Sequence, residues 1–455
     1  MNGASAVYWL TNFVSRTLTR LVGGRYWVLG CLLGAGVLRG IWVATMAPSP
    51  ISDFYSYYNL ALRLAQHFRY ESCPGFPTAY FPPGYPAMLA LCFKIASPSL
   101  VTALCCNVLL QVAGVWLIYA VARELFASEA VGRIAMLAWA LHPNSIIYTA
   151  LIASEHLFIP LMLLGMLLLL QARRLSWLAI PAGIVFGIAV LTRPQAILLP
   201  ALCYLILLPG ARQAGLLRRW VWQCALTHLL LLAVVLPWVA RNARLLHKPL
   251  LTTTTGWNLY IGNNPDANGG YVFTERMQAA LPAVASELER DELCRALARQ
   301  YIRAHPAQIV ALLPRKLVAL YVSELDGVLW IRDSLRHPFY PFTDPPLPLT
   351  LGQKVALIGG AVLVEAYYLS ILVALVLALS VVVCRKRGGE WPSALSLLAP
   401  AIICYFTALY LVYYGMPRYH MPMLPWMIIT IAGLAVCGKI DETAGVDYVS
   451  VSVSQ

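Results

Sequence analysis

The sequence predicts an all-α polytopic membrane protein, and three observations carry this prediction. First, 60% of the 455 residues are hydrophobic and only 12% are charged, whereas soluble domains carry about 25% charged residues. Second, apolar runs of about 20 residues, the length that crosses a bilayer as a helix, recur along the chain. Third, basic residues cluster at the ends of alternate runs. This composition excludes a disordered chain, a disulfide-stapled module and an ordinary soluble enzyme.

The apolar runs define ten predicted spans. They cover residues 26–46, 99–122, 131–150, 152–171, 177–192, 195–210, 222–241, 352–384, 393–414 and 419–438. The stretch 308–330 is also apolar, so it either lies on the membrane surface or adds a further span. We therefore expect a bundle of about 10–12 transmembrane helices.

The basic residues predict the orientation of these spans. With the N-terminal residues Arg16 and Arg20 in the cytoplasm, the basic flank of every even-numbered span falls on the cytoplasmic side, as the positive-inside rule requires. These flanks contain Arg123, Arg173, Arg174, Arg212, Arg218, Arg219, 385–387 (RKR) and Lys439. Topology thus accounts for the net charge of +13 without a nucleic-acid partner. Both termini are predicted inside, and the excess of arginine over lysine (27 to 6) favours a bacterial inner membrane.

The same topology predicts four parts of the chain. Residues 1–242 form an N-terminal transmembrane module, whose first outer loop is 47–98. Residues 243–350 form a long outer loop, in which the pattern predicts an amphipathic helix from Glu287 to His305. The C-terminal transmembrane helices lie in 351–440, and 441–455 is a cytoplasmic tail. The long loop carries eleven basic and ten acidic residues, and its length calls for secondary structure of its own.

Two acids are predicted at the outer ends of spans. Asp53 follows the first span and begins an amphipathic segment that includes Tyr57, and Glu155 opens the fourth span beside His156. Charges at such positions are costly, which makes both acids functional candidates. The structural alternative is a helix N-cap at Asp53 or Ser52 and, for Glu155, a first-turn carboxylate that complements the helix dipole. A lone histidine such as His156 is more often structural than a metal ligand.

Two arginines are predicted at the same outer side. Arg193 lies in a turn (LTRPQ), and Arg418 lies before the last span (GMPRYHMP). Such an arginine either extends to lipid headgroups or binds phosphate through its planar guanidinium. The rigid, polar turns around both residues favour phosphate binding, more strongly for Arg418.

Two loop motifs combine turn residues with aromatic and amide side chains. The segment 80–86 (YFPPGYP) contains Tyr80 and Tyr85, and 256–266 (GWNLYIGNNPD) contains Asn263 and Asn264. Such side chains suit stacking on sugar rings and hydrogen bonding to them. They suit ordinary turns equally well.

Taken together, these motifs resemble the GT-C superfamily of polyprenyl-phosphate-sugar-dependent glycosyltransferases. The similarity is greatest to the branch of protein O-mannosyltransferases and lipid A aminoarabinose transferases. The motifs occur in the order 52–54 (SDF), 82–86 (PPGYP), 154–158 (SEHLF), 237–242 (PWVARN) with 262–265 (GNNP), and 417–419 (PRY). Many relatives carry two adjacent acids after the first span, whereas Phe54 follows Asp53 here.

The resemblance implies a GT-C-like fold and transfer of a sugar from a polyprenyl monophosphate to an acceptor hydroxyl at the outer face, with inversion. It implies Asp53 as general base and Glu155 as a second acid that orients the acceptor or shares this role. Arg418 and Arg193 would bind the donor phosphate. The sugar or acceptor would contact Tyr57, Tyr80, Tyr85, His156, Asn263 and Asn264. The acceptor stays open among glycan, lipid and protein.

No cofactor is assigned from the sequence. There is no Gly-rich nucleotide-binding loop, and no metal-ligand set can be placed, so a divalent cation stays an open question. Two other functions compete with this interpretation. A polysaccharide ligase or polymerase would use lipid-linked glycans and outer-loop residues such as His247 and His305. A secondary transporter would place its charges near the membrane midplane instead.

Overall fold

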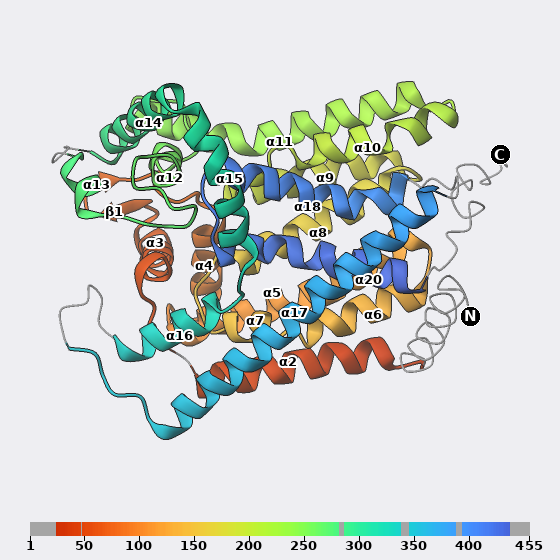
Figure 1. Ribbon diagram of the computed structural model, residues 1–455, viewed down its shortest axis with the longest axis horizontal. Helices are drawn as coiled ribbons and strands as arrows, with labels where there is room; N and C mark the ends of the chain where they lie inside the picture. Colours follow the sequence, from red (N-terminus) through yellow and green to blue (C-terminus); the bar gives the residue numbers. More distant parts are fainter. Residues whose placement is uncertain (1–23, 47, 282–285, 338–344, 388–393, 437–455) are drawn as a thin grey trace.

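A computed structural model describes residues 24–46, 48–281, 286–337, 345–387 and 394–436 of the chain. Within these ranges the protein is a bundle of helices with one small two-stranded sheet (Figure 1). Eight helices are long and apolar enough to cross a membrane. They are Trp27–Thr45, Leu100–Phe126, Glu155–Ala172, Pro194–Gln213, Leu217–Leu245, Leu351–Ser380, Leu395–Val412 and Pro417–Val436. The prediction of an all-α multi-pass membrane protein is confirmed.

These eight helices coincide with eight of the ten predicted spans. Their elements are α2 (Trp27–Thr45), α5 (Leu100–Phe126), α8 (Glu155–Ala172), η2 (Pro194–Ala196) with α10 (Leu199–Gln213), α11 (Leu217–Leu245), α17 (Leu351–Arg387), α18 (Ala394–Val412), and α19 (Pro417–His420) with η3 (Met421–Met423) and α20 (Leu424–Val436). Helix α8 lies at the centre, because 78% of its apolar window is buried inside the protein. The predicted cytoplasmic residues Arg16, Arg20, Lys439 and 441–455 lie outside the described residues.

The other two predicted spans are shorter than a bilayer requires. The run 131–150 is divided into α6 (Glu129–Ala140) and α7 (Pro143–Tyr148), since the extended backbone at His142 and the proline after it end one helix and start another. The run 177–192 forms η1 (Ser176–Leu178) and α9 (Ala179–Thr192), which together give a shorter apolar helix. The predicted run 131–150 is therefore two helices joined at His142 rather than one continuous helix.

The two predicted outer segments gather at one end of the bundle, on the left in Figure 1. The first contributes α3 (Ser52–His67), β1 (Glu71–Cys73), β2 (Phe76–Pro77) and α4 (Gly84–Ile95); the strands pair antiparallel. The second contributes α12 (Thr255–Gly262), α13 (Glu275–Ala279) and α14 (Glu287–Ala304). Helix α14 confirms the amphipathic helix predicted at this position. A small separate core of Tyr260, Ile261, Met277, Cys294, Ala298 and Tyr414 holds these elements together.

The apolar stretch 308–330 does not form a span. It is divided into α15 (Pro306–Tyr321) and α16 (Asp326–Arg336). Ser323 and Glu324 separate the two helices. The Ser323 hydroxyl and the Glu324 backbone amide both donate hydrogen bonds to the carboxylate of Glu365 in α17. These polar contacts turn the chain, so that α16 packs against α7 and α19 at the end of the bundle.

One acid ties the two outer segments to each other. The Glu287 carboxylate at the start of α14 accepts hydrogen bonds from Thr78 Oγ1 (2.7 Å), the Ala79 amide (2.8 Å) and Thr253 Oγ1 (3.0 Å). The loop before α4 is thereby fixed to the segment after α11, although more than 200 residues of sequence separate Glu287 from Thr78.

A glycine brings α4 against the end of α9. A Cβ on Gly84 would lie 2.8 Å from the Leu191 carbonyl oxygen and closer still to Thr192 Oγ1. Only glycine permits this approach. The PPGYP segment therefore lies beside residue 193, at the base of the candidate site.

Candidate active site

The two acids singled out by the sequence stand at the starts of their helices, but neither caps its helix. The N-cap of α3 is Ile51 and that of α8 is Ser154, and neither makes a side-chain cap hydrogen bond. The capping alternative for Asp53 and Ser52 is therefore wrong. Ser52 has a positive φ of 52°, which is rare for a residue with a side chain. Both carboxylates are left available for other partners.

Those partners are the two predicted arginines. Arg418 donates to Glu155 through Nε (2.5 Å to Oε1) and Nη2 (3.2 Å to Oε2), and to Asp53 through Nη1 (3.0 Å to Oδ2). Arg193 donates through Nη2 to Glu155 Oε1 (2.8 Å) and through Nε to Ser154 Oγ (3.1 Å). Four charges from four distant parts of the sequence thus form one cluster, which we call the charged cluster: Asp53, Glu155, Arg193 and Arg418.

The members of the charged cluster differ in their exposure. The Asp53 side chain is 45% exposed, whereas Glu155 is fully buried and Arg418 is 6% exposed. Arg193 is 10% exposed, and its Nη1 atom is buried without a hydrogen-bond partner. Formal charges in the cluster sum to zero. Asp53 is consequently the acid that a substrate can reach, and Arg193 keeps one donor that a further anion can use.

Aromatic side chains surround the charged cluster. The Arg418 guanidinium lies 5.3 Å from the centre of the Phe54 ring, as in a cation–π contact. Tyr57 donates from its hydroxyl to Ser154 Oγ (3.3 Å) and packs against Phe81. Burial raises the pKa of the Tyr57 and Tyr80 hydroxyls, and the charge of Asp53 raises both further. Both tyrosines therefore stay neutral hydrogen-bond donors beside the cluster.

Tyr85 and His156, which the sequence analysis gives as contacts of the sugar or acceptor, are buried behind the charged cluster. Tyr85 is fully buried and donates to Asn107 Oδ1 (2.8 Å). His156 is also fully buried. Its Nδ1 atom is hydrogen-bonded to Gln111 Nε2 (2.7 Å), and its Nε2 atom to the Tyr148 carbonyl oxygen (3.0 Å). The structure thus gives both side chains structural partners, and their contact with a sugar or acceptor stays a prediction.

The two asparagines likewise hold backbone. Asn263 donates to the carbonyl oxygens of Leu259 and Val412 and accepts from Lys316 Nζ (3.0 Å). Asn264 donates to the Tyr260 carbonyl oxygen (2.8 Å) and accepts from the Asp266 amide. Both side chains are buried. Asn263 therefore joins α12 to the segment before α19, whereas Asn264 holds the end of α12 and the turn after it; their contact with a sugar stays a prediction.

A further acid beside the charged cluster escaped the sequence analysis. Asp326, at the start of α16, accepts from the Tyr148 hydroxyl (3.0 Å) and from Trp330, and it lies within electrostatic reach of Arg418. Trp330 and Tyr148 both pack edge-on against Phe54. Burial raises the pKa of Asp326 to about 6. In the sequence, Asp326 is an acid followed by glycine inside an apolar run. It was overlooked because residues 308–330 were interpreted as one membrane-associated stretch.

The acids near the site do not offer a donor set for a divalent cation. Arg418 lies between the carboxylates of Asp53 and Glu155 and pairs with both, and Arg193 pairs with Glu155 as well. Among the described residues, no group of three or more histidine, cysteine, aspartate or glutamate side chains is arranged to hold a metal ion. We therefore derive no step through a metal.

Part of the chain matches a known protein family. A family model described as dolichyl-phosphate-mannose-protein mannosyltransferase matches residues 81–238, a stretch that contains Glu155 and Arg193. Among curated proteins, none matches the chain in sequence.

The solved structures that resemble the chain are distant from it. The apo oligosaccharyltransferase of Archaeoglobus fulgidus aligns at 14% identity with a TM-score of 0.48, over 90% of this chain and 50% of its own. ArnT from Cupriavidus metallidurans bound to undecaprenyl phosphate aligns at 13% identity with a TM-score of 0.44, over 91% of this chain and 78% of its own. The chain thus spans about half the length of the oligosaccharyltransferase.

The family match confirms the resemblance that the order of the sequence motifs indicates. Residues 81–238 are thus similar to a family described as dolichyl-phosphate-mannose-protein mannosyltransferase, within a chain that has eight helices long and apolar enough to cross a membrane in its described part.

Proposed function

We propose that the protein transfers a sugar from a polyprenyl monophosphate to an acceptor hydroxyl at the outer face of the membrane, with inversion at the anomeric carbon. The observation that carries this proposal is the charged cluster, in which one exposed carboxylate lies next to a guanidinium pair. The lipid tail of such a donor stays in the bilayer, which gives a physical reason for building the enzyme from spanning helices. The glycan, lipid or protein that provides the hydroxyl is not specified by this geometry.

Asp53 acts as the general base. One of its oxygens, Oδ2, accepts from Arg418, while the exposed side chain leaves the other oxygen accessible. The carboxylate takes the proton of the acceptor hydroxyl as the acceptor oxygen bonds to the anomeric carbon. The bond between this carbon and the phosphate oxygen breaks on the opposite face, and the lipid monophosphate leaves with the electron pair.

The arginines stabilise the charge that develops on this phosphate. Arg193 Nη1 is a buried donor without a partner, which makes it the natural contact for a phosphate oxygen. Arg418 keeps two further N–H groups beyond its bonds to the two acids. Both donors are fixed before the reaction, so little reorganisation is needed when the charge forms.

Glu155 is a positioning residue in this proposal. Both of its carboxylate oxygens already accept hydrogen bonds from the two guanidinium groups, so neither is free for a substrate. Its negative charge offsets the cost of burying two cations side by side. The role as a second base, which the sequence resemblance allowed, is therefore replaced by orientation of the two arginines.

The experiment that tests the proposal uses the purified protein in lipid nanodiscs with a panel of polyprenyl-phosphate sugars and acceptors, analysed by mass spectrometry. Asp53→Asn should lower the transfer rate by about 10²- to 10⁴-fold, the usual contribution of a general base. Asp333→Asn is the matched control, because Asp333 is an acid on α16 that pairs with Arg332. Transfer by Asp53→Asn at the wild-type rate would contradict the base assignment.

A further inference from the structure

Tyr271 is an exposed tyrosine in the segment between α12 and α13, at the end of the bundle where the outer segments gather (Figure 1). The residue is 52% exposed, and its hydroxyl lies within electrostatic reach of Asp53. An accessible aromatic ring with a hydroxyl group therefore lies near the carboxylate that the proposed function assigns as the base.

The backbone before Tyr271 is fixed, so the position of its ring is set in advance. Gly269 has a φ of 102°, and a Cβ at this position would lie 2.6 Å from the carbonyl carbon of Arg315 in α15. Only glycine permits both this conformation and this close approach. The Gly269 carbonyl oxygen also accepts a hydrogen bond from the Gly415 amide (2.8 Å). The segment is thereby joined to α15 and to the chain that leads to Arg418.

Neighbouring tyrosines extend this ring into a larger aromatic group. Tyr271 packs edge-on against Tyr414 with the ring centres 5.6 Å apart, and the Tyr414 hydroxyl is hydrogen-bonded to the Tyr419 hydroxyl (2.5 Å). The Tyr80 hydroxyl lies within electrostatic reach of both Tyr271 and Asp53. We call Tyr80, Tyr271, Tyr414 and Tyr419 the tyrosine cluster. It brings three distant parts of the chain together next to the proposed base.

The members of the tyrosine cluster differ in their relation to the arginines. Tyr419 lies within electrostatic reach of Arg193 and Arg418. The charge within reach of Tyr271 is that of Asp53. In a transfer with inversion, the acceptor and the leaving phosphate lie on opposite faces of the anomeric carbon. This difference favours Tyr271 as a contact of the acceptor rather than of the phosphate.

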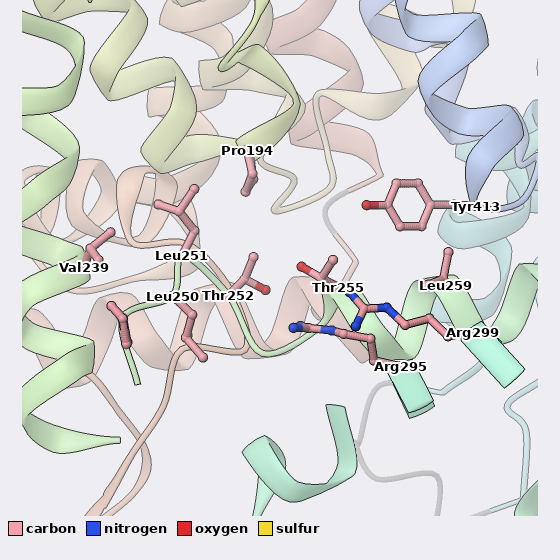
Figure 2. Close-up of a pocket in the computed structure, with 11 residues that line it drawn as sticks. Pro194, Val239, Leu250, Leu251, Thr252, Thr255, Leu259, Arg295, Arg299 and Tyr413 are labelled. Atoms are coloured by element: carbon pink, nitrogen blue, oxygen red, sulfur yellow. The ribbon is translucent and has the colours of Figure 1, made fainter. Parts of the chain in front are cut away.

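The segment before α19 contributes to two surfaces of different character. Figure 2 shows Tyr413 at a cavity of about 500 Å³ that Arg295 and Arg299 also line. The next residue, Tyr414, contacts Tyr271 instead. The cavity therefore has cationic side chains, whereas the members of the tyrosine cluster offer aromatic faces and hydroxyl groups.

We propose that the tyrosine cluster binds a sugar ring of the acceptor, with the exposed face of Tyr271 stacked on that ring, and that the acceptor is a glycan. The inference rests on the proposed function, because it takes Asp53 as the base that the acceptor hydroxyl meets. A tyrosine offers a sugar both an apolar face for the C–H groups of the ring and a hydroxyl for hydrogen bonds. A phosphate would require cationic donors, and an extended peptide would favour an open strand edge. The tyrosine cluster consists of neither.

The test measures binding in the absence of a donor, so that it does not depend on transfer. The purified full-length protein in phosphatidylcholine nanodiscs is applied to an array of oligosaccharides built from hexoses, pentoses or N-acetylhexosamines. Peptides that contain serine and threonine are placed on the same array. We expect binding to at least one oligosaccharide in clear excess over the peptides. Tyr271→Ala should weaken this binding about tenfold through loss of the stacking face, whereas Tyr271→Phe keeps the ring and should retain most of it.

Phe76→Ala is the matched control, because Phe76 is an exposed aromatic residue of the first outer segment that lies outside the tyrosine cluster. It should leave binding unchanged. Binding to no oligosaccharide, or binding that Tyr271→Ala leaves unchanged, would overturn the inference.

The transfer assay, run in parallel, distinguishes this inference from the proposed function. Transfer to a peptide or lipid by a protein that binds no oligosaccharide would refute the glycan acceptor alone. Glycan binding through Tyr271, together with transfer by Asp53→Asn at the wild-type rate, would refute the base assignment alone.

Discussion

Asp53 and Glu155 have the same functional group, yet the structure gives them different tasks. Glu155 is buried between two arginines, and Asp53 shares one of these arginines but faces outward. This difference in exposure is the reason why the proposed function assigns the role of base to Asp53 and not to Glu155. It also decides how much each acid contributes to stability.

Glu155→Gln should destabilise the protein far more than Asp53→Asn. Removing one partner of a buried ion pair leaves an uncompensated charge and costs about 3–5 kcal/mol, whereas an exposed pair contributes about 0–1 kcal/mol. The thermal unfolding midpoint is measured in detergent for both variants, and Asp53→Asn serves as the control. If the two substitutions lower the midpoint equally, Glu155 does not have the positioning role given to it.

Asp326 should make stability depend on pH. Burial raises the pKa of Asp326 to about 6 in the folded protein, above about 3.9 for an unfolded aspartate. Protonated Asp326 therefore adds to the free energy of unfolding below about pH 4. This added stability, on the order of 3 kcal/mol in all, is lost as the pH rises through 6.

Asp326→Asn removes this titration, and the difference between variant and wild type isolates it from other groups. Unfolding midpoints measured from pH 4 to pH 7 should show the variant gaining stability relative to wild type as the pH rises. A difference that stays constant over this range would rule out the raised pKa. The Tyr148 hydroxyl can still donate to the asparagine, so the packing around Phe54 is retained.

At the scale of elements, close helix contacts place the site. The approach of α4 to α9 at Gly84 brings the PPGYP segment beside Arg193, and Glu287 fixes the preceding loop to α14. The sequence indicated this turn by its proline and glycine content. It did not indicate which helix the glycine would meet.

Gly84→Ala should separate α4 from α9 and impair both stability and transfer. The new Cβ would collide with the backbone at Leu191, and such overpacking costs about 1–3 kcal/mol. Gly30→Ala is the matched control, because a Cβ on Gly30 in α2 meets no atom within 4 Å. Unfolding midpoint and transfer rate should fall for Gly84→Ala alone; equal behaviour of the two variants would refute the close contact.

At the scale of the whole molecule, one hydrophobic core extends through the bundle and includes residues from Ala35 to Ala432. The outer segments from both halves of the chain meet at the same end of this core (Figure 1). Arg418, near the end of the sequence, can therefore reach Asp53, near its beginning.

The basic flanks predict that this end of the bundle faces away from the cytoplasm. Insertion of a fluorescent protein after Gly215, between α10 and α11, should fluoresce in cells, since that loop is predicted inside. Alkaline phosphatase inserted after Ala280 should be active, because it matures only outside the cytoplasm. Phosphatase activity at position 215 instead of 280 would invert the proposed orientation.

The sequence by itself determined the class of fold and singled out the four charges that the structure gathers into the charged cluster. Long apolar runs can satisfy their backbone in a bilayer only as helices, and charges next to such runs are costly enough to identify Asp53, Glu155, Arg193 and Arg418 in advance. Short-range signals also located α14 and the turn before α4.

Only the tertiary structure decided which residues meet. Tyr85, His156 and Asn263 are buried and make hydrogen bonds to residues more than 20 positions away, which the sequence alone could not indicate. Because the stretch 308–330 is apolar on average, the sequence did not indicate that the helix ends at Ser323 and Glu324. The position of Asp326 beside Arg418 was therefore not predicted either. Contacts between distant segments follow from packing, which local patterns along the chain do not encode.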